Sequence, residues 1–254
     1  MNSGGAFIKR FVAALQFLTV FRIRSNLALE MADFPAMLAF FPLVGLFLGL
    51  MLGFLGFLFA KSFPALVSGA LLCASSAFFT RCLHLDGLAD VADGLGSHQP
   101  REQVLRIMKD SCTGAMGVIA LALVLILKSS ALGYLVQSGS YKFIILVPCL
   151  ARFSLNVLAS LSNYARPEGG LGKYFVGHDA KRQLVPACLT ALFAGLFLAG
   201  IGGLFLVAAI TLLAIFFAFF FKRRLGGVTG DVLGFQVEIS ETVLLLVGTA
   251  MHHG

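Results

Sequence analysis

Long apolar stretches separated by short polar segments run through the whole chain. A helix that crosses a hydrocarbon core about 30 Å thick needs about 20 apolar residues. The block 184–221 is 38 residues long, and Gly200, Gly202 and Gly203 near its middle indicate two helices joined by a tight turn. We therefore expect an all-α fold, a polytopic transmembrane helix bundle of about seven spans. The other five spans are predicted at about 34–60, 64–81, 117–136, 143–161 and 232–251.

Residues 6–21 show a different pattern, in which apolar side chains recur at helical spacing with Lys9 and Gln16 on the other side. This pattern predicts an amphipathic helix at the membrane interface, and an eighth spanning helix is the alternative. Polar loops are predicted at about 83–113, 162–183 and 222–230. We expect residues 1–254 to form a single integral membrane domain.

Composition and charge support a membrane protein with its polar segments on one side. Apolar residues make up 59% of the chain and charged residues 12%, whereas soluble domains contain about 25% charged residues. With the N-terminus in the cytoplasm, fifteen of the nineteen Lys and Arg residues, Arg24 among them, are cytoplasmic, as the positive-inside rule requires. The net charge of +7 suits anionic lipid and an anionic substrate, so no nucleic-acid partner is indicated. The five cysteines have no paired spacing and suggest neither a disulfide framework nor a thiolate metal site.

The first candidate site follows the second predicted span. Asp86, Asp90 and Asp93 lie within about 60° of arc if this segment is helical. Their mutual repulsion is about 1 kcal/mol per pair even in water, so a cation is needed, and oxygen ligands alone favour Mg²⁺, Mn²⁺ or Ca²⁺. The alternative is a solvated acidic helix face. His84 is a candidate general base or a structural hydrogen-bonding residue.

A second acidic face opens the last span. Asp231, Glu238 and Glu241 lie within about 80° of arc, and acids inside a membrane indicate function. We expect the two faces to share a metal site. Asp110 either joins that site or caps the following helix together with Ser111.

Basic and glycine residues are candidates for binding phosphate. One pair lies at i and i+4 in the span 143–161, and the others lie in the glycine-rich loop that follows. Glycines let backbone N–H groups approach phosphate oxygens, while Arg and Lys supply charge. An ordinary basic cytoplasmic loop is the alternative. The candidate substrate-binding residues are Arg152, Asn156, Arg166, Gly170, Gly172 and Lys173.

Four motifs are distributed along the chain. They are His-Leu-Asp-Gly-Leu-Ala-Asp-x-x-Asp-Gly at 84–94, Met-Lys-Asp-Ser at 108–111, Gly-Leu-Gly at 170–172 and Gly-x-Thr-Gly-Asp-x-Leu-Gly-x-x-x-Glu at 227–238. Together they resemble one family, the cobalamin 5′-phosphate synthases, also called adenosylcobinamide-GDP ribazoletransferases.

The resemblance covers most of the chain and implies a Mg²⁺-dependent enzyme of the bacterial inner membrane whose active site faces the cytoplasm. In the implied reaction, the ribosyl 3′-hydroxyl of α-ribazole, or of its 5′-phosphate, attacks the cobinamide-linked phosphorus of adenosylcobinamide-GDP. GMP leaves, and adenosylcobalamin or its 5′-phosphate forms.

The resemblance implies roles for the candidate residues. One of the carboxylates or His84 would accept the hydroxyl proton, with Asp86, Asp90 and Asp93 as the catalytic acids. A cation-coupled secondary transporter is the main alternative function, and a non-catalytic membrane scaffold is a third. Membrane lipid is an expected partner, and a homo-oligomer is left open by the sequence. The expected metal ligands are Asp86, Asp90, Asp93, Asp231, Glu238 and Glu241, with Asp110 as a further candidate.

Overall fold

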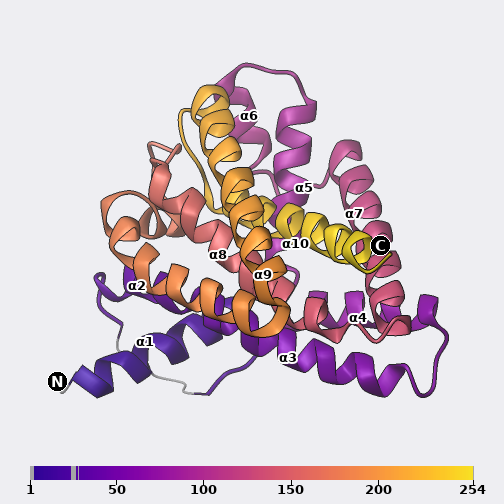
Figure 1. Ribbon diagram of the computed structural model, residues 1–254. Coiled ribbons are helices and arrows are strands. Elements are labelled where there is room, and N and C mark those ends of the chain that lie inside the picture. Colours follow the sequence, from indigo (N-terminus) through magenta and orange to yellow (C-terminus); the bar gives the residue numbers. More distant parts are fainter. Residues whose placement is uncertain (1–2, 24–26, 28, 254) are drawn as a thin grey trace.

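The computed structural model describes residues 3–23, 27 and 29–253, and in this part of the chain the regular secondary structure is helical (Figure 1). The predicted all-α fold is confirmed. Arg24, one of the cytoplasmic cations of the predicted topology, lies outside the described residues. The helices are α1 (Ser3–Leu18), α2 (Asp33–Met37), η1 (Leu38–Phe40), α3 (Phe41–Phe59), α4 (Ala65–Phe79), α5 (Leu83–Gly96), α6 (Arg101–Ile107), α7 (Ala115–Gln137), α8 (Tyr141–Leu161), η2 (Leu171–Phe175), α9 (His178–Leu225) and α10 (Gly230–His253).

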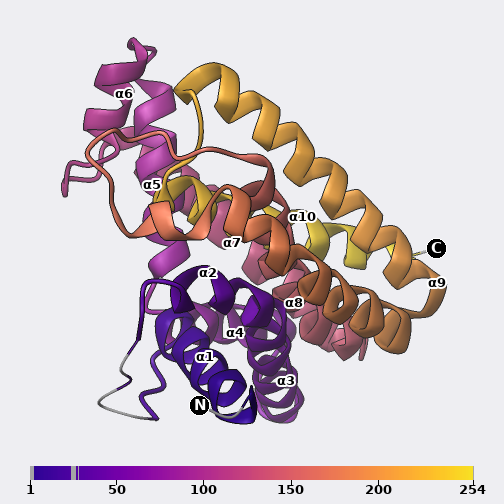
Figure 2. The same ribbon diagram turned by 90° about the vertical axis from the view of Figure 1, so that its left-hand side faces the viewer.

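Five helical segments within the described residues are long and apolar enough to cross a membrane, or six if the pair α4 and α5, bent by 93°, forms one broken span. Helix α9 counts once among them, although Gly200 has non-helical angles of φ 59° and ψ −142°. The chain turns back at this residue (Figure 2), which confirms the predicted division of the long apolar block. The expected number of about seven spans is thus approximate.

Helix α8 lies at the centre of the bundle and is buried along most of its length, where it packs against α3, α9 and α10. Glycines on α3 allow the close approach of α3 to α8. A Cβ atom on Gly45 or Gly49 would overlap the α8 backbone at Pro148 or Ile145. Small residues are favoured at such contacts because helices in lipid associate largely through close van der Waals packing.

Charged side chains inside the bundle form one buried group, which we call the four-charge cluster: Lys128 of α7, Arg152 of α8, and Glu238 and Glu241 of α10. Lys128 Nζ lies 2.9 Å from Glu238 Oε2 and 2.5 Å from Glu241 Oε2, and Arg152 pairs with the other oxygen of Glu241. Two positive and two negative charges cancel. The cluster therefore joins three helices and leaves none of its four charges without a partner in the apolar interior.

The N-terminal helix exists as predicted, with bounds Ser3–Leu18. Lys9, on the predicted polar side, contacts the rest of the bundle. Lys9 Nζ lies 2.7 Å from Asp33 of α2, and Arg10 Nε lies 3.0 Å from the same carboxylate. Arg81 also donates a hydrogen bond to the carbonyl oxygen of Phe17 at 2.9 Å. Helix α1 is thus tied to the bundle at its middle and near its C-terminal end, and its contact with lipid stays a prediction.

Because Glu241 bridges two cations, we expect Glu241→Gln to leave Arg152 buried without a charged partner. The free energy of unfolding should fall by about 3–5 kcal/mol. Denaturation of the purified protein in detergent would measure it. The matched control is Glu102→Gln on exposed α6, which should be neutral. Equal stability of the two variants would contradict a structural role for the cluster.

Candidate active site

Helices α5 and α10 cross closely because each has a glycine at the contact. A Cβ atom on Gly87 would lie 2.6 Å from the carbonyl oxygen of Asp231, and one on Gly234 would lie 3.2 Å from Cα of His84. Any larger residue would force the two backbones apart. The crossing therefore brings the start of α10 against the acidic segment of α5.

The acidic group at this crossing consists of Asp86, Asp90 and Asp93 of α5 with Asp231 of α10, and we call it the aspartate group. Asp86 is exposed, and the other three are half-buried. The charges of Asp231, Asp86 and Asp93 all act on Asp90, and the opposing positive charge is that of Arg166. Crowded carboxylates repel one another, so this group favours a cation.

Two segments far apart in the sequence position Arg166. Tyr164 and Val228 form an isolated parallel bridge, in which the Ala165 N–H donates to the Val228 carbonyl at 2.9 Å. This contact places Arg166 Nη2 2.6 Å from Asp231 Oδ2. Burial raises the pKa of the Tyr164 hydroxyl above its usual value, which is consistent with a partly enclosed loop. The cation predicted to bind phosphate therefore contacts the aspartate group directly.

Asp93 and Asp110 each have a local structural contact. The two carboxylate oxygens of Asp93 accept hydrogen bonds from the N–H groups of Gly114 and Gly117, at 2.7 and 2.8 Å, and so cap the start of α7. Asp110 accepts a bond from the Cys112 N–H at 3.0 Å within its own loop. The cap that we considered for Asp110 and Ser111 is thus supplied by Asp93 from α5.

Of the second acidic face, only Asp231 lies with the aspartates of α5, and the expectation that Glu238 and Glu241 join the same site is wrong. Glu238 and Glu241 belong to the four-charge cluster, where Lys128 and Arg152 neutralise them. Arg152 is only 1% exposed, so it lies inside the bundle and not in a loop that a substrate could reach. The sequence could not show this pairing because Lys128 lies more than a hundred residues before its glutamate partners.

Other predicted substrate-binding residues are divided between the core and the loop. Asn156 is buried and donates to the Leu38 carbonyl at 2.8 Å, so it joins α8 to η1. Gly172 packs against the start of α10, where a Cβ atom would lie 2.8 Å from the Gly230 nitrogen. Gly170 has φ 149°, a conformation that favours glycine, and Lys173 is exposed. The glycine loop therefore lies beside Asp231.

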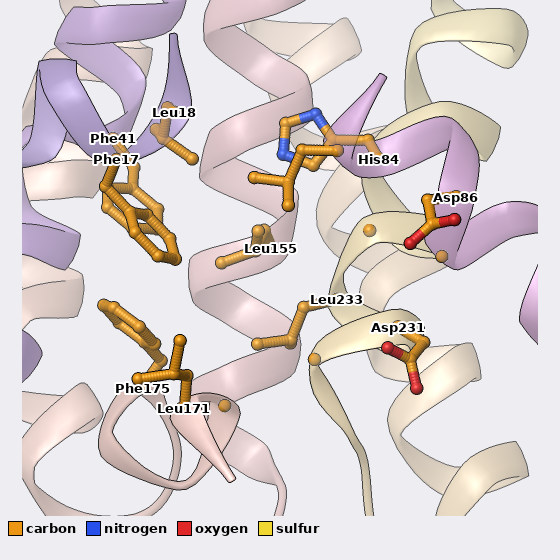
Figure 3. Close-up of a pocket in the computed structure, with 15 residues that line it drawn as sticks. Phe17, Leu18, Phe41, His84, Asp86, Leu155, Leu171, Phe175, Asp231 and Leu233 are labelled. Carbon is orange, nitrogen blue, oxygen red and sulfur yellow. The ribbon is translucent and has the colours of Figure 1, made fainter. Parts of the chain in front are cut away.

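A pocket of about 200 Å³ lies beside the aspartate group (Figure 3). Asp86, Asp231, Gly172 and the buried His84 line it, so the structure brings these four predicted residues together. No sequence signal pointed to the phenylalanine and leucine side chains in the wall, since these residue types are common throughout this chain. The missed residues are Phe17, Leu18, Phe41, Leu83, Leu155, Leu171, Phe175 and Leu233.

Within the described ranges, no three His, Cys, Asp or Glu side chains are arranged to hold a metal ion by themselves. Magnesium does not need such an arrangement, because it usually binds through one or two carboxylates together with substrate phosphates and water. The oxygen-only donors of the aspartate group suit this mode of binding.

The family model described as cobalamin-5-phosphate synthase matches residues 10–249. The chain belongs to this family. The match spans the aspartate group, the glycine loop and the start of α10, and it confirms the resemblance drawn from the motifs. No solved structure matches this member of the cobalamin-5-phosphate synthase family.

Curated relatives agree with the family assignment over nearly their full lengths. A protein of Syntrophobacter fumaroxidans is 43% identical over 95% of this chain and 98% of its own. Relatives of Geotalea daltonii and Pseudomonas aeruginosa are 38% and 39% identical, covering 96% and 94% of this chain and 98% and 97% of theirs. All three are named adenosylcobinamide-GDP ribazoletransferase.

Because Gly87 has no room for a side chain against α10, we expect Gly87→Ala to lower the free energy of unfolding by about 1–3 kcal/mol. Denaturation in detergent would measure the change. Gly5→Ala is the control, since no atom lies within 4 Å of an added Cβ there. If Gly87→Ala is as stable as this control, the close crossing of α5 and α10 is wrong.

Proposed function

We propose that this chain joins α-ribazole, or α-ribazole 5′-phosphate, to adenosylcobinamide-GDP and releases GMP. The observation that carries the proposal is that Asp86 and Asp231 line the same pocket and that Arg166 donates a hydrogen bond to Asp231. Carboxylates and a cation are the groups that phosphoryl transfer requires. The names of the curated relatives support the same reaction.

We propose Mg²⁺ as the cofactor, held by Asp86, Asp90 and Asp231. When bound, it would neutralise charge on the phosphate oxygens that react. Asp93 contributes its charge from nearby, but both its oxygens already accept backbone hydrogen bonds. The two glutamates of the four-charge cluster are left out of this ligand set because they are ion-paired in the core.

In the proposed reaction a bond forms between the ribosyl oxygen and the cobinamide-linked phosphorus, and the bond from that phosphorus to GMP breaks. The hydroxyl proton passes to a base, for which Asp86, Asp90 and His84 are the candidates. Asp86 is exposed at the pocket, whereas His84 is buried in its wall. Lys173 lies in the exposed glycine loop, where its mobile ammonium group is placed to contact phosphate.

We propose that the site opens to the cytoplasm of a bacterial cell, from a protein embedded in the inner membrane. Besides Leu155 of α8, the pocket is lined by the end of α1, the starts of α3 and α10, the η2 segment of loop 162–183 and the beginning of loop 83–113. In the topology that follows from the positive-inside rule, the end of α1, the two helix starts and both loops are on the cytoplasmic side. Water-soluble nucleotides would reach the pocket from that side.

The transporter alternative depended on membrane carboxylates that could bind a cation. Lys128 and Arg152 already pair with Glu238 and Glu241 in the bundle interior. No observation within the described residues favours coupled transport over transfer chemistry. Incubation of the purified protein with both substrates and Mg²⁺ would decide directly, because the transferase releases one GMP for each cobamide formed. Absence of GMP release with active substrates would refute the proposal.

Among the aspartates, we expect Asp86→Asn, Asp90→Asn and Asp231→Asn each to abolish GMP release with the fold intact. Each change removes a negative charge and a ligand oxygen at nearly constant volume. Initial rates across a Mg²⁺ titration would measure the effect. Asp179→Asn, at the exposed start of α9, is the control that should keep wild-type rates. Full activity of any two of the three variants at limiting Mg²⁺ would disprove the ligand set.

Arg166 allows a test of phosphate contact. If its guanidinium binds the reacting phosphates more tightly in the transition state, Arg166→Ala should lower kcat roughly ten- to a hundredfold, equivalent to about 1.5–3 kcal/mol. Arg166→Lys keeps the charge but loses the planar fork, so it should recover only part of the rate. Steady-state kinetics with adenosylcobinamide-GDP would show this. Normal kcat/KM in both variants would give Arg166 a structural role, in which it donates hydrogen bonds to Asp231 and to the Met108 carbonyl oxygen.

A further inference from the structure

The pocket has two chemically different sides (Figure 3). Phe17, Phe41 and Phe175 lie together on one side, and Asp86 and Asp231 lie on the other. Leucines lie between the two groups. Such a pocket suits a ligand with an aromatic part at one end and hydrogen-bond donors, such as hydroxyl groups, at the other.

The aromatic side is a built surface whose three rings come from separate parts of the chain. Phe17 lies near the end of α1, Phe41 begins α3, and Phe175 ends η2. The ring centroids are 5.1 Å apart for Phe17 and Phe175, 5.7 Å for Phe41 and Phe175, and 6.2 Å for Phe17 and Phe41. These separations are those of mutually packed rings, and a flat ring can add to such a group by stacking.

The volume of the pocket limits what it can hold. A cavity of about 150 Å³ accommodates benzene, so about 200 Å³ has room for a fused two-ring base. Pockets for whole drug-sized ligands are larger, about 300–1,000 Å³. The corrin macrocycle of the donor exceeds even that class of ligand. By size, two bases of the proposed substrates fit inside, the guanine of the donor and the benzimidazole of the acceptor. The phenylalanine and leucine wall favours the benzimidazole, because the amide and amino groups of guanine would be buried there without enough hydrogen-bond partners.

His84 supplies a polar contact in the wall of the pocket. It is 3% exposed, and its Nδ1 has no hydrogen-bond partner among the residues that the structure describes. A buried nitrogen without a partner costs free energy, so a ligand with a complementary ring nitrogen or hydroxyl is favoured there. The benzimidazole of α-ribazole has one ring nitrogen that is not bonded to the sugar.

We propose that this pocket is the subsite for the acceptor nucleoside. The benzimidazole stacks on the ring surface formed by Phe17, Phe41 and Phe175, and its ribose lies toward Asp86 and Asp231. The inference rests on the proposed function, which it deepens by naming the residues that recognise the acceptor. The donor binds outside this pocket, on the side of the aspartate group, so that the sugar hydroxyl and the phosphorus meet between the two.

The test uses the full-length protein and two probes, α-ribazole in turnover and free 5,6-dimethylbenzimidazole in direct binding. Phe17→Leu removes one ring, and we expect the KM for α-ribazole to rise about five- to a hundredfold. The KM for adenosylcobinamide-GDP should not change. Phe221→Leu is the matched control, because Phe221 is fully buried in another aromatic cluster and does not line the pocket.

A second variant fills the pocket without removing packing. Leu155 of α8 lies in the pocket wall, and Leu155→Phe should occupy the space of the base. We expect it to abolish binding of 5,6-dimethylbenzimidazole and to raise the KM for α-ribazole, with unfolding stability unchanged or increased. This variant also decides the matter if Phe17→Leu proves too unstable to purify.

Separate readouts distinguish the failure of this inference from the failure of the proposed function. If the wild-type protein releases GMP but both variants leave the KM for α-ribazole and base binding unchanged, the subsite is wrong and the function stands. If the free base binds in a manner that Leu155→Phe abolishes but no GMP is released, the subsite stands and the proposed reaction is wrong. If Phe17→Leu lowers only the unfolding temperature, the three rings are a docking surface for α1 and the inference is overturned.

Discussion

The architecture depends on the cost of placing charge in an apolar interior. Lys128, Arg152, Glu238 and Glu241 can remain ionised inside the bundle only if they stay together. Their pairing fixes the face that α10 turns toward α7 and α8. Since Asp231 lies close to the same face of α10 as Glu238, seven residues earlier, that rotation also sets where Asp231 points. An ion-pair cluster in the core thus helps to orient a carboxylate at the surface.

Close backbone contact extends this arrangement to the candidate active site. Gly87 and Gly234 let α5 and α10 cross with little space between them, so Asp231 meets the aspartates of α5. The bridge between Tyr164 and Val228 brings Arg166 to the same place. Asp93 meanwhile anchors α7 through two backbone hydrogen bonds. Rigid support of this kind is what catalytic groups need, because small displacements of reacting groups cost rate.

The aspartates of the α5 motif therefore have two different roles. Asp93 stabilises the start of a membrane helix, whereas Asp86 faces a pocket whose opposite side is aromatic. In the proposed function this division separates the group that positions helices from the groups that meet substrate. It also explains why a family motif can be continuous in sequence while its members differ in role.

The sequence by itself determined the all-α membrane fold, the break at Gly200 and the acidic and glycine-rich segments that identify the family. These features are local, since span length, helical periodicity and motif spacing are properties of neighbouring residues. Only the tertiary structure decided that Glu238 and Glu241 pair with the buried cations Lys128 and Arg152. The two glutamates therefore do not join the aspartate group. The choice of partner depends on how helices distant in the sequence pack. The same holds for the pocket: Phe17, Phe41 and Phe175 are ordinary apolar residues until folding brings their rings together beside Asp86 and Asp231.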